Sequence, residues 1–110
     1  VNISSIVGAT GNYGQVNYAA AKAGMIGMTK ALAKELARYH VTVNAICPGF
    51  MDTPMVRAVP EDVQKKIVDQ IPLGCFGPPS AVAEGVAYLA GPGGDWITGQ
   101  VLHINGGMYM

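Results

Sequence analysis

Tyr18 and Lys22 are the residues whose types and spacing could most directly move a proton. Three alanines separate them in a run that favours helix, so we expect the phenol and the ammonium on one helical face, about 5 to 6 Å apart. A phenol is a poor acid or base at neutral pH, and a cation fixed beside it favours its ionised form. The pair is therefore predicted to act as an acid or base; a chance surface pairing is the alternative for an isolated Tyr-x-x-x-Lys.

A serine lies thirteen residues before Tyr18. Ser5 closes an apolar run at residues 1–5 that predicts the end of a buried strand, and the glycine-rich residues 8–14 predict a turn and loop. Chemistry at Ser5 would thus lie at the carboxyl end of a strand. Ser4 competes for this role, but neighbouring side chains of a strand face opposite ways, so only one of the two serines can face a given site.

The helix that carries Tyr18 is predicted to extend from residue 15 to about residue 39, because this stretch is rich in Ala, Met, Leu and Lys and contains no proline. Gly24 and Gly27 fall about one turn apart within it. We expect these glycines to mark a face that packs closely against another element.

The other predicted elements alternate in type. Strands are expected at residues 41–47 and 100–105, which are β-branched and apolar. Helices are expected at residues 60–70 and 80–90, the second after a Pro78-Pro79-Ser80 start that supplies a cap. Such alternation with apolar strands predicts an α/β fold in which helices cover a parallel sheet. Sheets of this kind bind ligands outside the carboxyl ends of their strands.

The composition excludes several classes of function. Seven basic residues balance seven acidic ones among 110 residues, and only 13% are charged, which argues against binding to nucleic acid or an anionic membrane surface. No apolar run approaches the roughly 18 residues of a membrane span, so we expect a soluble chain of one domain at most. Cys47 and Cys75 lack metal-ligand spacing, which predicts free thiols and no metal site.

Four segments carry a resemblance to a known family. They read NISS at residues 2–5, NYAAAKAG at 17–24, VNAICPGF at 43–50 and LHINGGMYM at 102–110. A strand-end Ser, a Tyr-x-x-x-Lys thirteen residues on, and a later Pro-Gly followed by Thr resemble the short-chain dehydrogenase/reductase family. Within that family the segments are similar to bacterial reductases of 3-oxoacyl thioesters.

The resemblance implies a Rossmann-type, doubly wound parallel sheet, of which this chain would supply about three strands with their covering helices. Residues 1–110 would be the carboxyl-terminal half of a single domain. The amino-terminal dinucleotide-binding half, with the Thr-Gly-x-x-x-Gly-x-Gly loop that cradles the cofactor pyrophosphate, would be absent. An independent cofactor site in these residues alone is therefore not expected.

The resemblance also implies catalytic roles. Ser5, rather than Ser4, would donate a hydrogen bond to the substrate carbonyl oxygen. Tyr18 would protonate the forming alkoxide as general acid, or deprotonate the alcohol in the reverse direction. Lys22 would bind the nicotinamide ribose and assist Tyr18, so both residues would also contact the cofactor. A Ser bonded to its own loop, a core Tyr and a solvated Lys are the competing interpretations.

Further cofactor contacts are implied in the segment after the second strand. Pro48 and Gly49 would shape it, and Met51 and Thr53 would hold the nicotinamide carboxamide; a plain turn explains Pro48-Gly49 equally well in isolation. Residues 55–76 resemble the family's substrate-covering segment.

The function implied is NADPH-dependent reduction of a 3-oxoacyl group carried on acyl carrier protein, in cytoplasmic fatty-acid biosynthesis. NADPH is favoured over NADH by the subfamily alone. A homo-oligomer, dimer or tetramer, is also implied. Alternatives are reduction of acetoacetyl-coenzyme A or another small ketone, and a non-catalytic oligomerisation piece.

Three basic residues recur every four positions on the long helix: Lys30, Lys34 and Arg38. A solvated face is the simpler interpretation of this stripe, and a docking surface for an acidic carrier protein is the alternative. His40 and His103 are expected far from Ser5, and we assign neither a catalytic role.

Overall fold

The computed structural model describes all residues, 1–110, and is built on a three-stranded parallel sheet. Its strands are β1 (Asn2–Ile3), β2 (Ala45–Pro48) and β3 (Val101–Ile104), with β2 in the centre. Ala45 pairs with Asn2 on one side and with Val101 on the other. The predicted α/β fold with a parallel sheet is confirmed.

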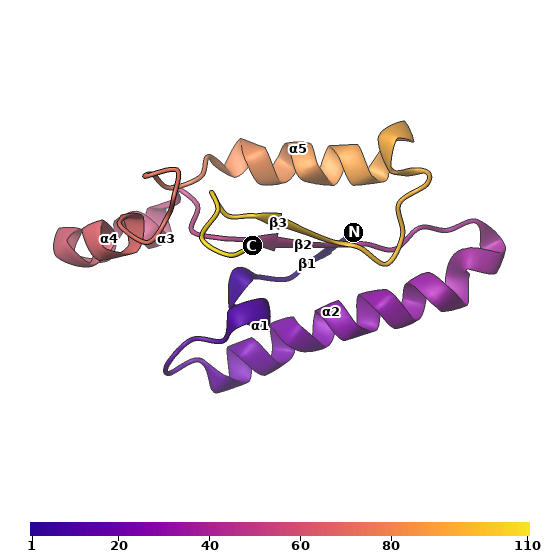
Figure 1. Ribbon diagram of the computed structural model, residues 1–110, viewed down its shortest axis with the longest axis horizontal. Helices are drawn as coiled ribbons and strands as arrows, with labels where there is room; N and C mark the ends of the chain where they lie inside the picture. Colours follow the sequence, from indigo (N-terminus) through magenta and orange to yellow (C-terminus); the bar gives the residue numbers. More distant parts are fainter.

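Helices cover both faces of this sheet (Figure 1). On one face lie α1 (Ile6–Thr10) and the long α2 (Val16–Leu36), which pack against each other, and on the other face lies α5 (Pro79–Ala90). Gly85 lets α5 approach β3 closely, since a Cβ there would stand 2.7 Å from the Ile104 side chain. The carboxyl ends of the strands are thus left open between two helical layers.

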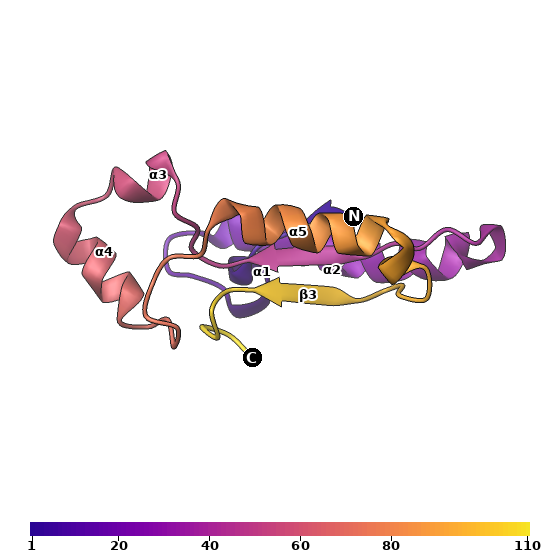
Figure 2. The same cartoon turned by 90° about the horizontal axis from the view of Figure 1, so that it is seen from above.

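The remaining helices are short. Both α3 (Pro54–Arg57) and α4 (Glu61–Val68) lie beyond the carboxyl end of β2, as Figures 1 and 2 show from two directions. The 3₁₀ turns η1 (Ala37–Tyr39) and η2 (Pro92–Gly94) follow α2 and α5. Residues after each strand therefore gather at one end of the molecule, as the topology requires.

The core is small and centred on β2. Ala45, Ile46 and Cys47 have no solvent exposure, yet only 15 of the 110 residues are buried. The radius of gyration is 15.0 Å, against about 13 Å for a compact domain of this length. The sheet with its two helical layers is therefore long and thin, with a principal extent of 50 Å.

The strand predicted at residues 41–47 is shorter than expected. It begins at Ala45, because Val43 and Asn44 bond to the irregular segment before β3. The Asn44 side chain donates to the Ile97 carbonyl at 2.7 Å and accepts from the Gln100 amide at 3.0 Å. On the side of β3 these side-chain bonds take the place of ladder bonds, whereas toward β1 the Asn44 carbonyl still accepts from the Asn2 amide at 2.8 Å.

Two short helices were not predicted. The loop expected after Ser5 is instead the five-residue α1, and α3 has only four residues. Each begins at a hydroxyl that accepts a backbone hydrogen bond: Ser5 from Val7 at 3.2 Å, and Thr53 from Val56 at 3.4 Å. Helices of about one turn are too short to show an apolar period.

Two smaller predictions about helices were wrong. Gly24 and Gly27 do not pack closely against another element of this chain, since a Cβ at either would meet nothing within 4 Å. Ser80 is not a cap, because α5 begins at Pro79 after Pro78, and no side chain caps it. Proline with its fixed φ starts this helix instead.

The cysteines are free thiols, as predicted, with Cys47 buried in β2 and Cys75 exposed. His, Cys, Asp and Glu side chains form no group of three that could hold a metal ion. None of the helices is both long enough and apolar enough to cross a membrane.

Candidate active site

A cavity of about 410 Å³ opens at the carboxyl ends of the strands. Five of the predicted site residues line it, namely Ser5, Tyr18, Gly49, Met51 and Thr53. The rest of its wall consists of Ile6, Val7, Asn12, Gln15, Phe50, Met55 and Val56. Residues more than 40 positions apart in the sequence thus meet in one cavity.

Ser5 lies where β1 gives way to α1. Its side chain is mostly buried, at 9% exposure, and its oxygen accepts the hydrogen bond from the Val7 amide that caps α1. A hydroxyl has one proton to donate as well as two lone pairs. Ser5 can therefore keep its place in the chain as an acceptor and still donate to a ligand oxygen.

Ser4 faces away from Ser5, toward the long helix. Its hydroxyl donates to the backbone carbonyl of Lys22 at 2.7 Å, and it does not line the cavity. This arrangement follows from the alternation of side chains along an extended chain. Of the two serines, only Ser5 is available to a ligand in the cavity.

Tyr18 and Lys22 lie on one face of α2, as their spacing predicts. The Lys22 ammonium is 5.6 Å from the centroid of the Tyr18 ring and donates to the Ile3 carbonyl at 2.9 Å. An ammonium has three protons, so two remain for other acceptors. Tyr18 is 41% exposed and lines the cavity, whereas Lys22 stands behind that wall.

Gly8 sets the distance between Ser5 and the Tyr18 helix. A Cβ at Gly8 would lie 2.7 Å from the Lys22 carbonyl carbon and 2.9 Å from the Ala23 amide nitrogen. Only glycine allows α1 to approach the backbone of α2 this closely. Gly8 thus allows α1 and α2 to form one wall of the cavity.

The segment after β2 forms the opposite wall. Gly49 donates to the Ile104 carbonyl at 2.8 Å, and a Cβ there would come within 2.6 Å of the Asn105 Cβ. Met51 forms an isolated parallel bridge with Gly77. The backbone N–H groups of Met51 and Thr53 donate to no acceptor, so two donors remain available beside the cavity.

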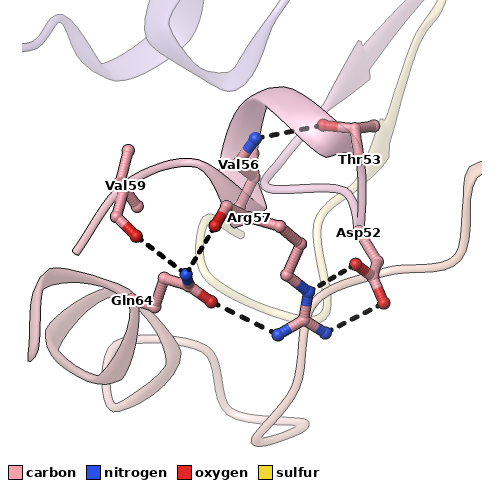
Figure 3. A network of polar contacts seen from close by, with 6 residues as sticks. All are labelled: Asp52, Thr53, Val56, Arg57, Val59 and Gln64. Atoms are coloured by element: carbon pink, nitrogen blue, oxygen red, sulfur yellow. Dashed lines mark hydrogen bonds and ion pairs between the residues drawn. The ribbon is translucent and has the colours of Figure 1, made fainter. Parts of the chain in front are cut away.

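Asp52, next to these free donors, is paired with Arg57 (Figure 3). The guanidinium donates to both carboxylate oxygens, Nε to Oδ1 at 2.6 Å and Nη2 to Oδ2 at 2.9 Å. These hydrogen bonds hold the pKa of the Asp52 carboxyl below its ordinary value and raise the pKa of Arg57; charge attraction adds to both shifts, and partial loss of solvent opposes them.

A second cavity, of about 530 Å³, adjoins the first and shares Ile6, Val7, Asn12 and Phe50 with it. Its further lining residues come from the ends of α1 and α4, from the residues just beyond them and from the carboxyl terminus: Thr10, Gly11, Ile67, Gln70 and Met108. Five of its nine lining residues are apolar, which suits the apolar part of a ligand.

Comparison with known proteins decides the family. The family model described as enoyl-(acyl carrier protein) reductase matches residues 1–109. This chain belongs to the short-chain dehydrogenase/reductase family.

Relatives in this short-chain dehydrogenase/reductase family include three proteins named 3-oxoacyl-(acyl-carrier-protein) reductase FabG. The protein from Aquifex aeolicus is 55% identical over 109 residues, which are 99% of this chain and 44% of the relative. Those from Vibrio cholerae and Staphylococcus epidermidis are 50% and 51% identical over 110 residues, which are 100% of this chain and 45% of each relative. The chain spans less than half the length of these relatives.

The predicted site of this short-chain dehydrogenase/reductase is only partly gathered in one cavity. Lys22 and Pro48 do not line it, because Lys22 turns toward β1 and Pro48 ends β2. His103 and His40 do not line either of the two cavities. The roles of the gathered residues remain predictions.

Two features of this region were missed from the sequence. Asp52 and Arg57 are five positions apart, a spacing that neither helix nor strand periodicity singles out. The second cavity depends on where α4 and the carboxyl terminus fold back onto the rest of the chain. The only sequence signal for this cavity is the expectation that residues 55–76 cover a substrate.

Proposed function

We propose that this chain carries the catalytic residues of an NADPH-dependent reductase of 3-oxoacyl thioesters, with acyl carrier protein as the carrier. The observation that carries the proposal is the meeting of Ser5 and Tyr18 in one cavity opposite Met51 and Thr53. The names of the relatives support the substrate class. A cytoplasmic role in fatty-acid synthesis is part of the same proposal.

In this mechanism the Ser5 hydroxyl donates to the ketone oxygen and stabilises the negative charge that develops there. A hydride adds to the carbonyl carbon and forms a C–H bond, while the C=O π electrons move to oxygen. The Tyr18 O–H bond breaks and its proton passes to that oxygen, which gives the 3-hydroxyacyl thioester. The Lys22 ammonium, 5.6 Å from the ring, opposes the charge left on the phenolate.

The cofactor would supply the hydride when bound. The free N–H groups of Met51 and Thr53 suit the oxygen of a nicotinamide carboxamide, and the two remaining protons of the Lys22 ammonium suit ribose hydroxyls. Tyr18, Pro48 and the backbone at Gly49 complete the proposed cofactor contacts. NADPH rather than NADH is proposed from the resemblance to this group of reductases alone.

Residues 1–110 are proposed to be the carboxyl-terminal half of one domain, which a dinucleotide-binding half completes. Support comes from the share of the relatives that the chain spans, 44% to 45%, and from the thinness of the sheet. Its edge strand β1 has only two residues, and Ile3 is 40% exposed. An edge strand presents unpaired backbone N–H and C=O groups that further structure can pair with.

A homo-oligomer is proposed as well. Gly24 and Gly27 on α2 meet nothing within 4 Å, and Met28 beside them is 46% exposed. Small and apolar side chains on an exposed helix face suit contact with another copy. The same observation supports the alternative that the chain serves only as an oligomerisation piece, which predicts self-association without turnover.

The substrate class is tested by supplying the intact protein that carries this chain with NADPH and each of four substrates in turn. These are a 3-oxoacyl thioester of acyl carrier protein, acetoacetyl-coenzyme A, a small free ketone and a trans-2-enoyl thioester. The proposal predicts the highest kcat/KM for the carrier-bound 3-oxoacyl group. Preference for the free ketone or the enoyl thioester, or no turnover with any of them, would overturn it.

A further inference from the structure

Arg57, at the end of α3, contacts three other segments, two of which, at Asp52 and Gln64, are drawn in Figure 3. Its guanidinium binds both oxygens of Asp52 and donates a third hydrogen bond to Gln64 of α4 at 3.3 Å. It also lies 5.1 Å from the centroid of the Phe76 ring, on the returning chain. Bidentate, charge-assisted bonds of this kind are stronger and more directional than neutral ones.

Gln64 completes the connection between the two short helices. Its amide nitrogen donates to the Arg57 carbonyl at 3.1 Å and to the Val59 carbonyl at 2.9 Å. Arg57 and Gln64 therefore bind each other through both side-chain and backbone atoms. Val59 lies in the link between α3 and α4. Gln64 therefore binds this link as well as α3 itself.

Backbone hydrogen bonds join the two ends of the segment that contains α3 and α4. The Asp52 amide donates to the Gly77 carbonyl at 2.8 Å, and the Gly77 amide donates to the Phe50 carbonyl at 3.0 Å. Residues 53–76 thus form an excursion that is closed at its base by backbone bonds. Above that base, the Arg57 guanidinium contacts Asp52 before the excursion, Gln64 in α4 and Phe76 at its end.

Both cavities depend on this excursion for part of their walls. Thr53 and Val56 of the first half line the cavity that holds Ser5 and Tyr18. Ile67 and Gln70, at the end of α4 and just beyond it, line the adjoining cavity. A side chain that fixes α4 relative to α3 therefore fixes the two cavities relative to each other.

We propose that Arg57 is a positioning residue that clamps α4 to the Asp52–Thr53 segment, so that the second cavity stays aligned with the proposed catalytic hydroxyls. The kinetic consequence rests on the function proposed above, whereas the clamp itself does not. Arg57 touches neither cavity, so it acts through the helices that it joins.

The clamp is tested by amide hydrogen exchange in the chain of residues 1–110. Arg57→Gln is compared with Arg57→Lys, which keeps the charge but loses the bidentate geometry. Arg38→Gln is the matched control, because Arg38 also lies over an aromatic ring, Tyr39, at 4.7 Å, but forms no ion pair.

We expect the amides of α4 to exchange about three-fold faster in Arg57→Gln, as for the loss of a good exposed ion pair. Arg57→Lys should lie between Arg57→Gln and the parent chain, and the amides of β2 should be unaffected in every variant. Unchanged exchange in α4, or the same increase in Arg38→Gln, would overturn the clamp.

Positioning is tested by kinetics of the intact protein with a 3-oxoacyl thioester. Arg57→Gln should raise KM about three-fold to ten-fold and leave kcat within about two-fold, since the reacting groups stay in place. A fall in kcat of about three-fold to ten-fold with no change in KM would overturn the positioning role. If the parent protein shows no reductase activity, the proposed function fails, and the exchange comparison alone decides on the clamp.

Discussion

The Ser4 hydroxyl donates a 2.7 Å hydrogen bond to the backbone carbonyl of Lys22. Lys22 returns a bond of its own, from its ammonium to the Ile3 carbonyl at 2.9 Å. The end of β1 and the first half of α2, the helix that carries Tyr18, are thereby joined by two hydrogen bonds. These two bonds fix the position of Tyr18 relative to Ser5.

Replacing Ser4 with alanine should destabilise the chain. Ser4 is 3% exposed and its only side-chain bond is to the Lys22 carbonyl, so Ser4→Ala removes a buried hydrogen bond worth about 1 kcal/mol. Chemical denaturation measures the loss as a lower midpoint. Ser80→Ala is the control, because Ser80 is exposed and caps nothing. Equal midpoints for the two variants would show that the bond does not hold the helix in place.

Gly8→Ala should destabilise, although alanine is the better helix former. The added methyl would meet the α2 backbone at 2.7 Å, and displacing a packed helix typically costs about 1 to 3 kcal/mol. That outweighs the gain in helix propensity, about 1 kcal/mol at most.

Gly24→Ala is the matched control for this substitution, since a Cβ at Gly24 meets nothing within 4 Å. It should raise the melting temperature by the gain in helix propensity alone. If both alanine variants melt above the parent chain, α1 and α2 do not pack as closely as described.

The pKa of the Asp52 carboxyl should lie below its ordinary value because Asp52 accepts hydrogen bonds from Arg57. The carboxyl pKa is lowered from 3.8, chiefly by the Arg57 hydrogen bonds. A lowered pKa means that the pair contributes stability above 3.8 and loses it as the pH falls through the lower, folded value.

The measurement is an NMR titration of the Asp52 carboxyl carbon. Its midpoint should lie below 3.8 in the parent chain and move up in Arg57→Gln, because Asp52 then loses its hydrogen-bond donors and the nearby positive charge. A midpoint that is the same in both chains would mean that the ion pair is not populated in solution.

The sequence predicts those features that follow from the regular repeat of a helix or from the topology of a parallel sheet. Tyr18 and Lys22 share a face because the helix repeats every 3.6 residues, and Ser5 meets Thr53 because the carboxyl ends of parallel strands lie at one edge of a sheet. Each inference needs only local spacing and topology, and both are present in the structure.

Other features were beyond such reasoning because they depend on how distant segments fold back. Asn44 looks like a strand residue, yet its side chain bonds to Ile97 and the Gln100 amide. Arg57 looks like a solvated charge, yet it joins Asp52 to α4. In both cases a side chain finds a partner that no sequence spacing indicates.

The central claim is that Tyr18 supplies the proton. Its most direct test is NADPH oxidation by the intact protein with acetoacetyl-coenzyme A, comparing Tyr18→Phe with Tyr88→Phe, a control on the opposite side of the sheet, where the ring is 54% exposed. We predict that Tyr18→Phe lowers kcat by about 10² to 10⁴ with an unchanged melting temperature, and that Tyr88→Phe has no effect. Turnover of Tyr18→Phe at the parent rate would contradict the account.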